Sequence, residues 1–275
     1  MSDANSALRL AVLDNSIDKI NEAVVINGAD VNSRSEEKLP LWKYRGSGTG
    51  NSALHIALWQ GSPRPIIDRL LELGADVNLK SSGNLCTPLH CAVKGNNVDV
   101  VAILLDRGCD PNAKDKDETT PLSWGACHDS KEAIELLLER GADIHDRSKL
   151  GETAFLFSCW SGHCRVAEAL LARGANVHDE EIYGNSSLSY AAQFGKVEVV
   201  KMLINLGANI YKPNKSSRSA LALASMFNQD EVVSILRNWP VTMAIIVMQE
   251  LFVYNQVDVA SFSDLFEFIG VGSNI

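Results

Sequence analysis

The sequence lacks most features that mark enzymes, membrane proteins and nucleic-acid-binding proteins. It has no phosphate-cradling glycine loop, no kinase signature and no nucleophile elbow, so nothing in it indicates catalysis. A formal net charge of -9 argues against a general nucleic-acid surface. The most apolar segment, within residues 241–254, is interrupted by Gln249 and Glu250 and is too short to span a bilayer. We therefore predict no catalytic residues, no cofactor, no nucleic-acid partner and no membrane insertion.

The chain also lacks a basic region followed by an apolar run near its start, so we predict no secretory signal. Its six cysteines mostly replace small apolar residues, and we expect reduced thiols in a cytoplasmic protein, with a nuclear location also open. Cys159, His163 and Cys164 come closest to a metal cluster, yet zinc needs four ligands. We expect no metal, and a Cys/His-dependent enzyme or zinc protein stays a minor alternative.

What the sequence does contain is a strict period of 33 residues. The clearest copy spans residues 87–112, TPLHCAVKGNNVDVVAILLDRGCDPN. Its first residue recurs at this step as Thr87, Thr120, Thr153, Ser186 and Ser219. Its closing glycine recurs as Gly108, Gly141, Gly174 and Gly207. A fixed period of this length is typical of a solenoid of stacked repeats.

The physical chemistry of the copy predicts two short helices. Thr87 followed by Pro88 suits a helix start, because Thr caps and Pro is tolerated in the first turn. Asn96 lies where the chain turns between the helices and needs a left-handed residue, and other copies place glycine there. Gly108 ends the second helix. Because neither helix can bury its apolar face alone, each copy must stack on a neighbour.

These residues resemble the ankyrin repeat. Residues 87–90, Thr-Pro-Leu-His, look like the opening motif of that family, and residues 108–110, Gly-Cys-Asp, look like its closing Gly-Ala-Asp. The resemblance covers residues 6–239 and implies an all-α ankyrin-repeat solenoid of about seven helix-turn-helix repeats with hairpin fingers. The repeats are expected near residues 6–32, 52–78, 87–112, 120–145, 153–178, 186–211 and 219–239.

Two segments depart from the period. Residues 33–51 form an inserted loop that carries Trp42 and Tyr44, and long loops on solenoids often lie on the binding face. Residues 240–275 follow the regular array of residues 1–239, and their apolar pattern predicts two helices. We expect these helices to form a C-terminal cap, because the last repeat of a solenoid otherwise exposes its apolar face.

The resemblance also implies where a partner would bind. In ankyrin proteins the fingers and the exposed face of each first helix form a concave groove that binds other proteins. Groove positions would follow each opening Thr or Ser by seven and eight residues, and several of them are aromatic, although a single ring could instead pack against its own finger. With one finger tip and the inserted loop added, the expected partner-binding residues are Trp59, Gln60, Lys94, His128, Trp160, Tyr183, Gln193, Phe194, Met226, Phe227, Trp42 and Tyr44.

Histidines and charged finger tips leave alternatives open. His55 and His90 hold the fourth place of the opening motif, where we favour a hydrogen-bonding role over a metal ligand or a base. Residues 179–181 make one tip acidic, and Lys212, Lys215 and Arg218 make the next basic. Such runs are usually solvated loops, yet opposite signs on adjacent tips could fix the register of a bound peptide.

The sequence therefore predicts a monomeric, non-catalytic protein–protein interaction module that holds a partner protein in its concave groove. An alternative is an adaptor whose C-terminal helices recruit a second complex while the groove holds a client. The sequence does not identify the partner, since one scaffold serves unrelated ones.

Overall fold

The computed structural model describes residues 2–34 and 50–239, which are helical apart from their turns and loops. The first helices of the repeats are α1 (Ser2–Leu13), α3 (Ala53–Gln60), α5 (Pro88–Lys94), α7 (Pro121–Cys127), α9 (Ala154–Ser161), α11 (Ser187–Gln193) and α13 (Ala220–Met226). The second helices are α2 (Ile17–Asn21), continued by the π-helix η1 (Glu22–Ile26), then α4 (Arg64–Glu72), α6 (Val98–Asp106), α8 (Lys131–Glu139), α10 (Cys164–Ala172), α12 (Val197–Asn205) and a helix over residues 230–239. The predicted all-α solenoid is confirmed.

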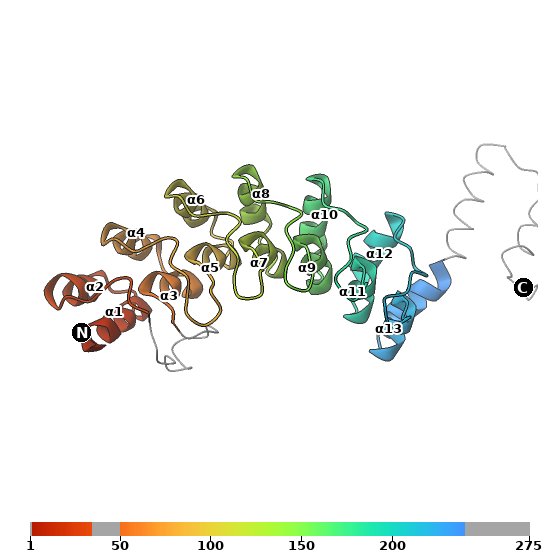
Figure 1. Ribbon diagram of the computed structural model, residues 1–275, viewed down its shortest axis with the longest axis horizontal. Helices are drawn as coiled ribbons and strands as arrows, with labels where there is room; N and C mark the ends of the chain where they lie inside the picture. The colour runs from red at the N-terminus through yellow and green to blue at the C-terminus, as the bar shows by residue number, and fades with distance from the viewer. Residues whose placement is uncertain (1, 35–49, 240–275) are drawn as a thin grey trace, which may run out of the picture.

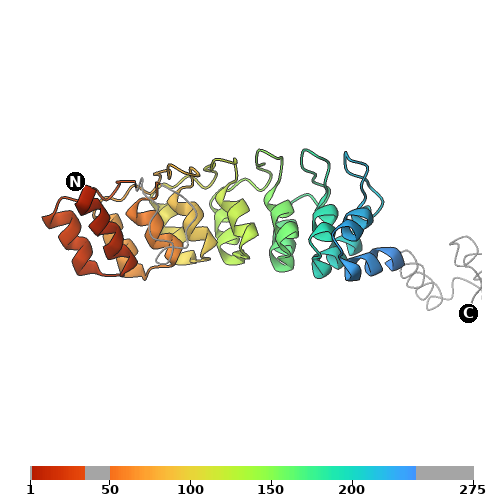
Figure 2. The same ribbon diagram turned by 90° about the horizontal axis from the view of Figure 1, so that it is seen from below.

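The helices form two rows along a gently curved array. Figure 1 shows the first helices on the inner, concave side of the arc and the second helices on its outer side. Seen from below, the loops between repeats project together from one edge of the array (Figure 2). Contacts run between neighbouring repeats, as between α3 and α5, α5 and α7, and α7 and α9. The inner helices therefore present one continuous face.

Helix starts and turns follow from the residues that recur in each copy. The side chain of Thr120 accepts a hydrogen bond from the Ser123 amide, and Ser186 caps α11 in the same way. Asn96 takes the predicted left-handed conformation, with φ of 49°, where Gly162 has φ of 90° in its own repeat. The second repeat contains one extra residue, which it accommodates in the turn that precedes α4 and includes Pro63.

The core is a stack of equivalent side chains. Each of the central second helices buries one leucine completely, in the series Leu70, Leu104, Leu137, Leu170 and Leu203. Burial of each such side chain contributes about 1.5–3 kcal/mol, so the array is stabilised by many similar interfaces and has no single centre.

The finger loops are held to one another by the main chain. Each donates one backbone hydrogen bond to the preceding finger, as in Lys149 N to Asp117 O at 2.9 Å and Ile182 N to Leu150 O at 2.8 Å. Within the described ranges the fingers form no strands, and their extended pairing is limited to one antiparallel bridge between Glu180 and Ser186.

An asparagine ladder joins the turns at the ends of the second helices. The side-chain amide of Asn112 donates to Gly141 O at 3.1 Å, and its oxygen accepts from Asp143 N at 2.8 Å. Asn32 and Asn78 make the equivalent bond to the next repeat. His145 stands at the following position of the period, where the structure gives no such bond to its side chain, so the ladder stops midway.

Some expectations fall outside the described residues. Trp42 and Tyr44 of the inserted loop and the cap over residues 240–275 belong to this group. Over residues 2–34 and 50–239, no helix combines the length and apolar character needed to cross a membrane.

Candidate functional site

The concave face carries a band of large side chains contributed by the inner helices. Trp160 at the end of α9 is 38% exposed, and Phe194 after α11 is 40% exposed. The other groove residues predicted from the sequence and described here are also partly or fully accessible, namely Trp59, Gln60, Lys94, His128, Gln193, Met226 and Phe227. All of them are therefore accessible to solvent.

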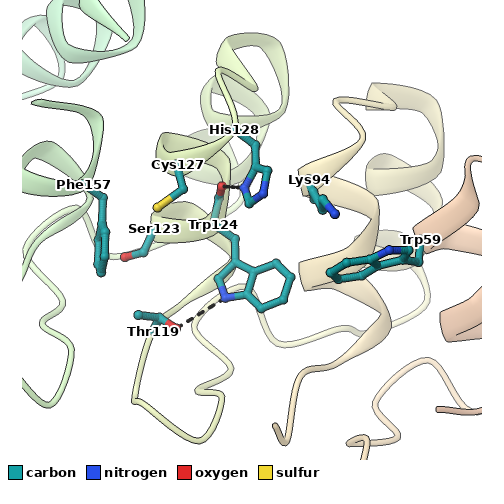
Figure 3. A pocket seen from close by; sticks show the side chains of 8 residues that line it. All are labelled: Trp59, Lys94, Thr119, Ser123, Trp124, Cys127, His128 and Phe157. Carbon is teal, nitrogen blue, oxygen red and sulfur yellow. Dashed lines mark hydrogen bonds between the residues drawn. The ribbon is translucent and has the colours of Figure 1, made fainter. Parts of the chain in front are cut away.

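A pocket of about 400 Å³ opens within this band between α3, α5, α7 and α9 (Figure 3). Trp59 projects from α3 and Lys94 from α5, while α7 supplies Trp124 near its middle and Cys127 at its end. The complete lining is Trp59, Lys94, Thr119, Ser123, Trp124, Cys127, His128 and Phe157. The rings of two tryptophans and one phenylalanine, an imidazole and an ammonium group thus share one cavity.

Trp124 organises the pocket. Its indole Nε1 donates to Asp115 Oδ2 at 3.0 Å and to Thr119 Oγ1 at 3.3 Å, which ties the ring to the preceding finger. The ring makes a T-shaped contact with Trp59, with 6.0 Å between the ring centroids, and His128 stacks on it at a centroid distance of 6.2 Å. Because these contacts fix the indole, the pocket is formed before any partner arrives.

The pocket carries one cation. Lys94 Nζ lies 3.4 Å from the centroid of the Trp59 ring, within range of a cation–π interaction. Burial lowers the pKa of Lys94, and burial is also the main cause that lowers the pKa of His128. The lowered pKa favours the neutral form of His128, and its Nδ1 donates to Trp124 O at 2.8 Å. The positive charge of the pocket therefore comes from Lys94.

The aromatic band continues beyond the pocket. Phe157 lines the pocket, and its ring centroid lies 6.0 Å from that of Trp160. The ring centroid of Trp160 in turn lies 5.7 Å from that of Phe194. Together with the contact between Trp59 and Trp124, rings are present on four of the inner helices or directly after them, from α3 to α11. We call this set, from Trp59 to Phe194, the aromatic band.

Comparison with known families supports the interpretation of the repeats. A family model described as ankyrin repeats (3 copies) matches four overlapping stretches, residues 8–115, 54–148, 108–181 and 155–242. These cover far more than half of the chain. The chain belongs to the ankyrin repeat family. Ankyrin repeats are generally protein–protein interaction modules and are typically non-catalytic. No curated protein matches this ankyrin chain.

The residues at the centre of the pocket were not predicted from the sequence. Trp124 and Phe157 follow the opening threonines of their ankyrin repeats by four residues, and Tyr190 occupies the same place in the next copy. That place lies one helical turn before a predicted groove position, so its side chain shares the groove face. Three aromatics at one repeat position are the signal that could have revealed them.

The side chains of Gln60 and Tyr183 differ in how far they are available to a partner. The side-chain amide of Gln60 donates to Val12 O at 2.8 Å and to Ser62 Oγ at 2.7 Å, so it already joins neighbouring ankyrin repeats. Tyr183, by contrast, is exposed at its finger tip. The Gln60 side chain is therefore less available for hydrogen bonds to a partner than the Tyr183 side chain.

The finger-tip charges are largely engaged within the array. Arg147 Nη2 lies 2.6 Å from Asp179 Oδ1, and Lys212 forms an ion pair with Glu180. The buried carboxylate of Glu181 accepts the amide of Tyr183 at 2.9 Å. Opposite charges on adjacent tips thus bind neighbouring ankyrin fingers to each other, and this weakens the hypothesis that they fix the register of a bound peptide.

The two motif histidines act within the fold. His55 Nδ1 lies 2.8 Å from Ser52 Oγ, and its Nε2 donates to Cys86 O at 3.0 Å. His90 makes the same pair of contacts, to Thr87 Oγ1 at 2.9 Å and to Thr119 O at 3.2 Å. Burial lowers the pKa of each to about 4. The predicted hydrogen-bonding role is confirmed.

Five of the six cysteines have a raised pKa, which suppresses their reactivity, whereas a hydrogen bond with Cys91 lowers the pKa of Cys86. All six are free thiols, and burial raises the pKa of Cys127 and of Cys109 to about 12. Cys159 is buried in α9, while His163 and Cys164 lie at the start of α10, as expected. Nowhere in residues 2–34 and 50–239 do three or more His, Cys, Asp or Glu side chains form a group that could hold a metal ion.

Proposed function

We propose that the chain is a monomeric, non-catalytic interaction module whose concave face binds a partner protein. The observation that supports this is the aromatic band. Its rings form two contacting groups, Trp59 with Trp124 and Trp160 with Phe157 and Phe194, and Trp160 and Phe194 are exposed. Accessible apolar rows on a protein surface favour association, and aromatic side chains dominate the energetics of interfaces.

Trp160 is the residue of the band best placed to test this proposal. It contacts Phe157 on one side and Phe194 on the other, so it lies inside the row. Its exposed fraction of 38% is large enough to contact a partner and small enough to leave the ring anchored. Removing an anchor of this kind costs an interface about 2 kcal/mol or more, which is a loss of affinity of about 30-fold.

The test is affinity capture from native extract, followed by measurement of the affinity for the captured protein. Trp160→Ala should bind that protein about 30-fold more weakly while its helical content stays unchanged by circular dichroism. Leu206→Ala is the matched control, because Leu206 is 50% exposed but follows the outer helix α12. If Trp160→Ala unfolds the array and binding per folded molecule is unchanged, the ring is a core residue and the proposal fails.

An adaptor is the second candidate. Here the concave face would hold a client while residues 240–275 recruit another complex, and the apolar pattern of those residues is the observation that favours it. An enzyme or zinc protein gains no support, because His55 and His90 are buried in capping contacts. Deleting residues 241–275 distinguishes a C-terminal cap, whose loss lowers stability, from an adaptor, whose loss removes a partner.

A further inference from the structure

The pocket in the aromatic band contains a positive charge, the ammonium group of Lys94. No carboxylate among the described residues forms an ion pair with Lys94, whose ammonium rests on the face of Trp59. Asp115 is the acidic residue bonded to the pocket wall, and its carboxylate already accepts from Trp124 Nε1 and from Thr119. In a chain of net charge -9, a cation inside an apolar cavity that pairs with no described carboxylate points to a ligand of the opposite charge.

The same contact argues against a cationic ligand. Aromatic pockets can hold ammonium groups through the faces of their rings. Here Lys94 already covers the face of Trp59 and would repel a second cation. The remaining rings, Trp124 and Phe157, offer apolar area, since the polar atom of the Trp124 ring is hydrogen-bonded to the finger.

The protonation of Lys94 supports the same reading. Partial burial of its ammonium lowers its pKa, because the charged form has lost part of its hydration. A carboxylate placed beside it would restore a favourable interaction for that charge. An apolar side chain placed beside the rings would in turn exclude water and strengthen the ion pair.

The size of the cavity sets the scale of the occupant. A volume of about 400 Å³ lies in the lower part of the range for small-ligand sites and suits one large apolar side chain with its adjoining main chain. We propose that the pocket receives a partner segment in which a large apolar side chain, next to Trp124 and Phe157, adjoins an Asp or Glu that pairs with Lys94. This inference rests on the proposed function and specifies the chemistry of its partner.

The experiment is selection of a displayed random peptide library on the full chain. The wild-type protein should enrich peptides that carry Asp or Glu within two residues of an aromatic or large aliphatic side chain. Lys94→Glu should bind the enriched peptides at least tenfold more weakly, and selection on it should favour Lys or Arg at the acidic position. Lys201→Glu, the same charge change on the outer helix α12, should bind them within twofold of the wild type.

Several results would overturn the inference. They are enrichment of neutral or basic peptides, indifference of the selected peptides to Lys94→Glu, and no enrichment over a blank surface. The captured partner protein separates this inference from the proposed function. If its binding depends on Trp160 but not on Lys94, the inference of an acidic segment at the pocket is wrong, whereas the proposal that the concave face binds the partner holds. If its binding depends on neither residue, the concave surface itself is wrong.

Discussion

Lowering the pH should destabilise the array through its two capping histidines. His55 and His90 each accept the backbone N–H of the helix cap on Nδ1 and donate from Nε2 to the following finger. A proton on Nδ1 would replace this acceptor by a donor that faces the N–H, inside a buried site. This geometry adds to burial, the main cause of their lowered pKa.

The sign and size of the effect follow from the two pKa values. The folded-state pKa of each histidine is about 4, whereas the unfolded chain has the ordinary value of 6.5. Between these values the unfolded state binds more protons, so stability is fully present above pH 6.5 and falls as the pH falls. At pH 5 each histidine should lower the free energy of unfolding by about 2 kcal/mol relative to pH 7.5, since one pKa unit corresponds to about 1.4 kcal/mol.

The assay is urea unfolding at a series of pH values from 7.5 to 5, followed by circular dichroism. The control is the double variant His55→Ser, His90→Ser, because Ser123 and Ser189 occupy the same place in other repeats. The control is expected to be less stable at pH 7.5 and to lose much less stability on acidification. If the wild type and the double variant lose equal stability between pH 7.5 and 5, the buried histidines are not the cause.

Two further predictions concern the asparagine ladder and residues 241–275. His145→Asn should extend the asparagine ladder to Gly174 and stabilise the fold by about 0.5–1.5 kcal/mol. Asn112→Ala should destabilise the fold by a similar amount, and thermal melts measure both changes. A lower melting temperature for His145→Asn would refute this prediction. Deleting residues 241–275 should cause insolubility or a large fall in melting temperature, with loss concentrated in the last two repeats, if those residues form a cap. A truncated protein that is equally stable but loses one partner would instead support the adaptor.

The repeat could be predicted from the sequence because its signals are local. Thr87 and Pro88 start a helix, Asn96 supplies the left-handed turn and Gly108 the helix end, whatever lies around them. The period then fixes which side chains recur on each face. The all-α solenoid, the hydrogen-bonding histidines and the turn before α4 could therefore all be anticipated.

The pocket could not be predicted so directly, because it depends on packing across four helices. Trp124 occupies a repeat position that Cys91 fills as a buried core residue in the preceding copy. Its exposure to the groove follows from its size and from its bond to Asp115, which a linear pattern does not show. The finger-tip pairing of Arg147 with Asp179 was missed because its members lie one repeat apart.

The most direct measurement of the central claim is site-specific photo-cross-linking in cells. A benzophenone amino acid placed at Phe194, in the aromatic band, is compared with the same group placed at Leu206, on the outer side. If the concave face binds the partner, a discrete covalent adduct with one protein forms from the position of Phe194 and none forms from that of Leu206. Adducts from Leu206 alone, or from neither position, would contradict the claim that the concave aromatic band binds the partner.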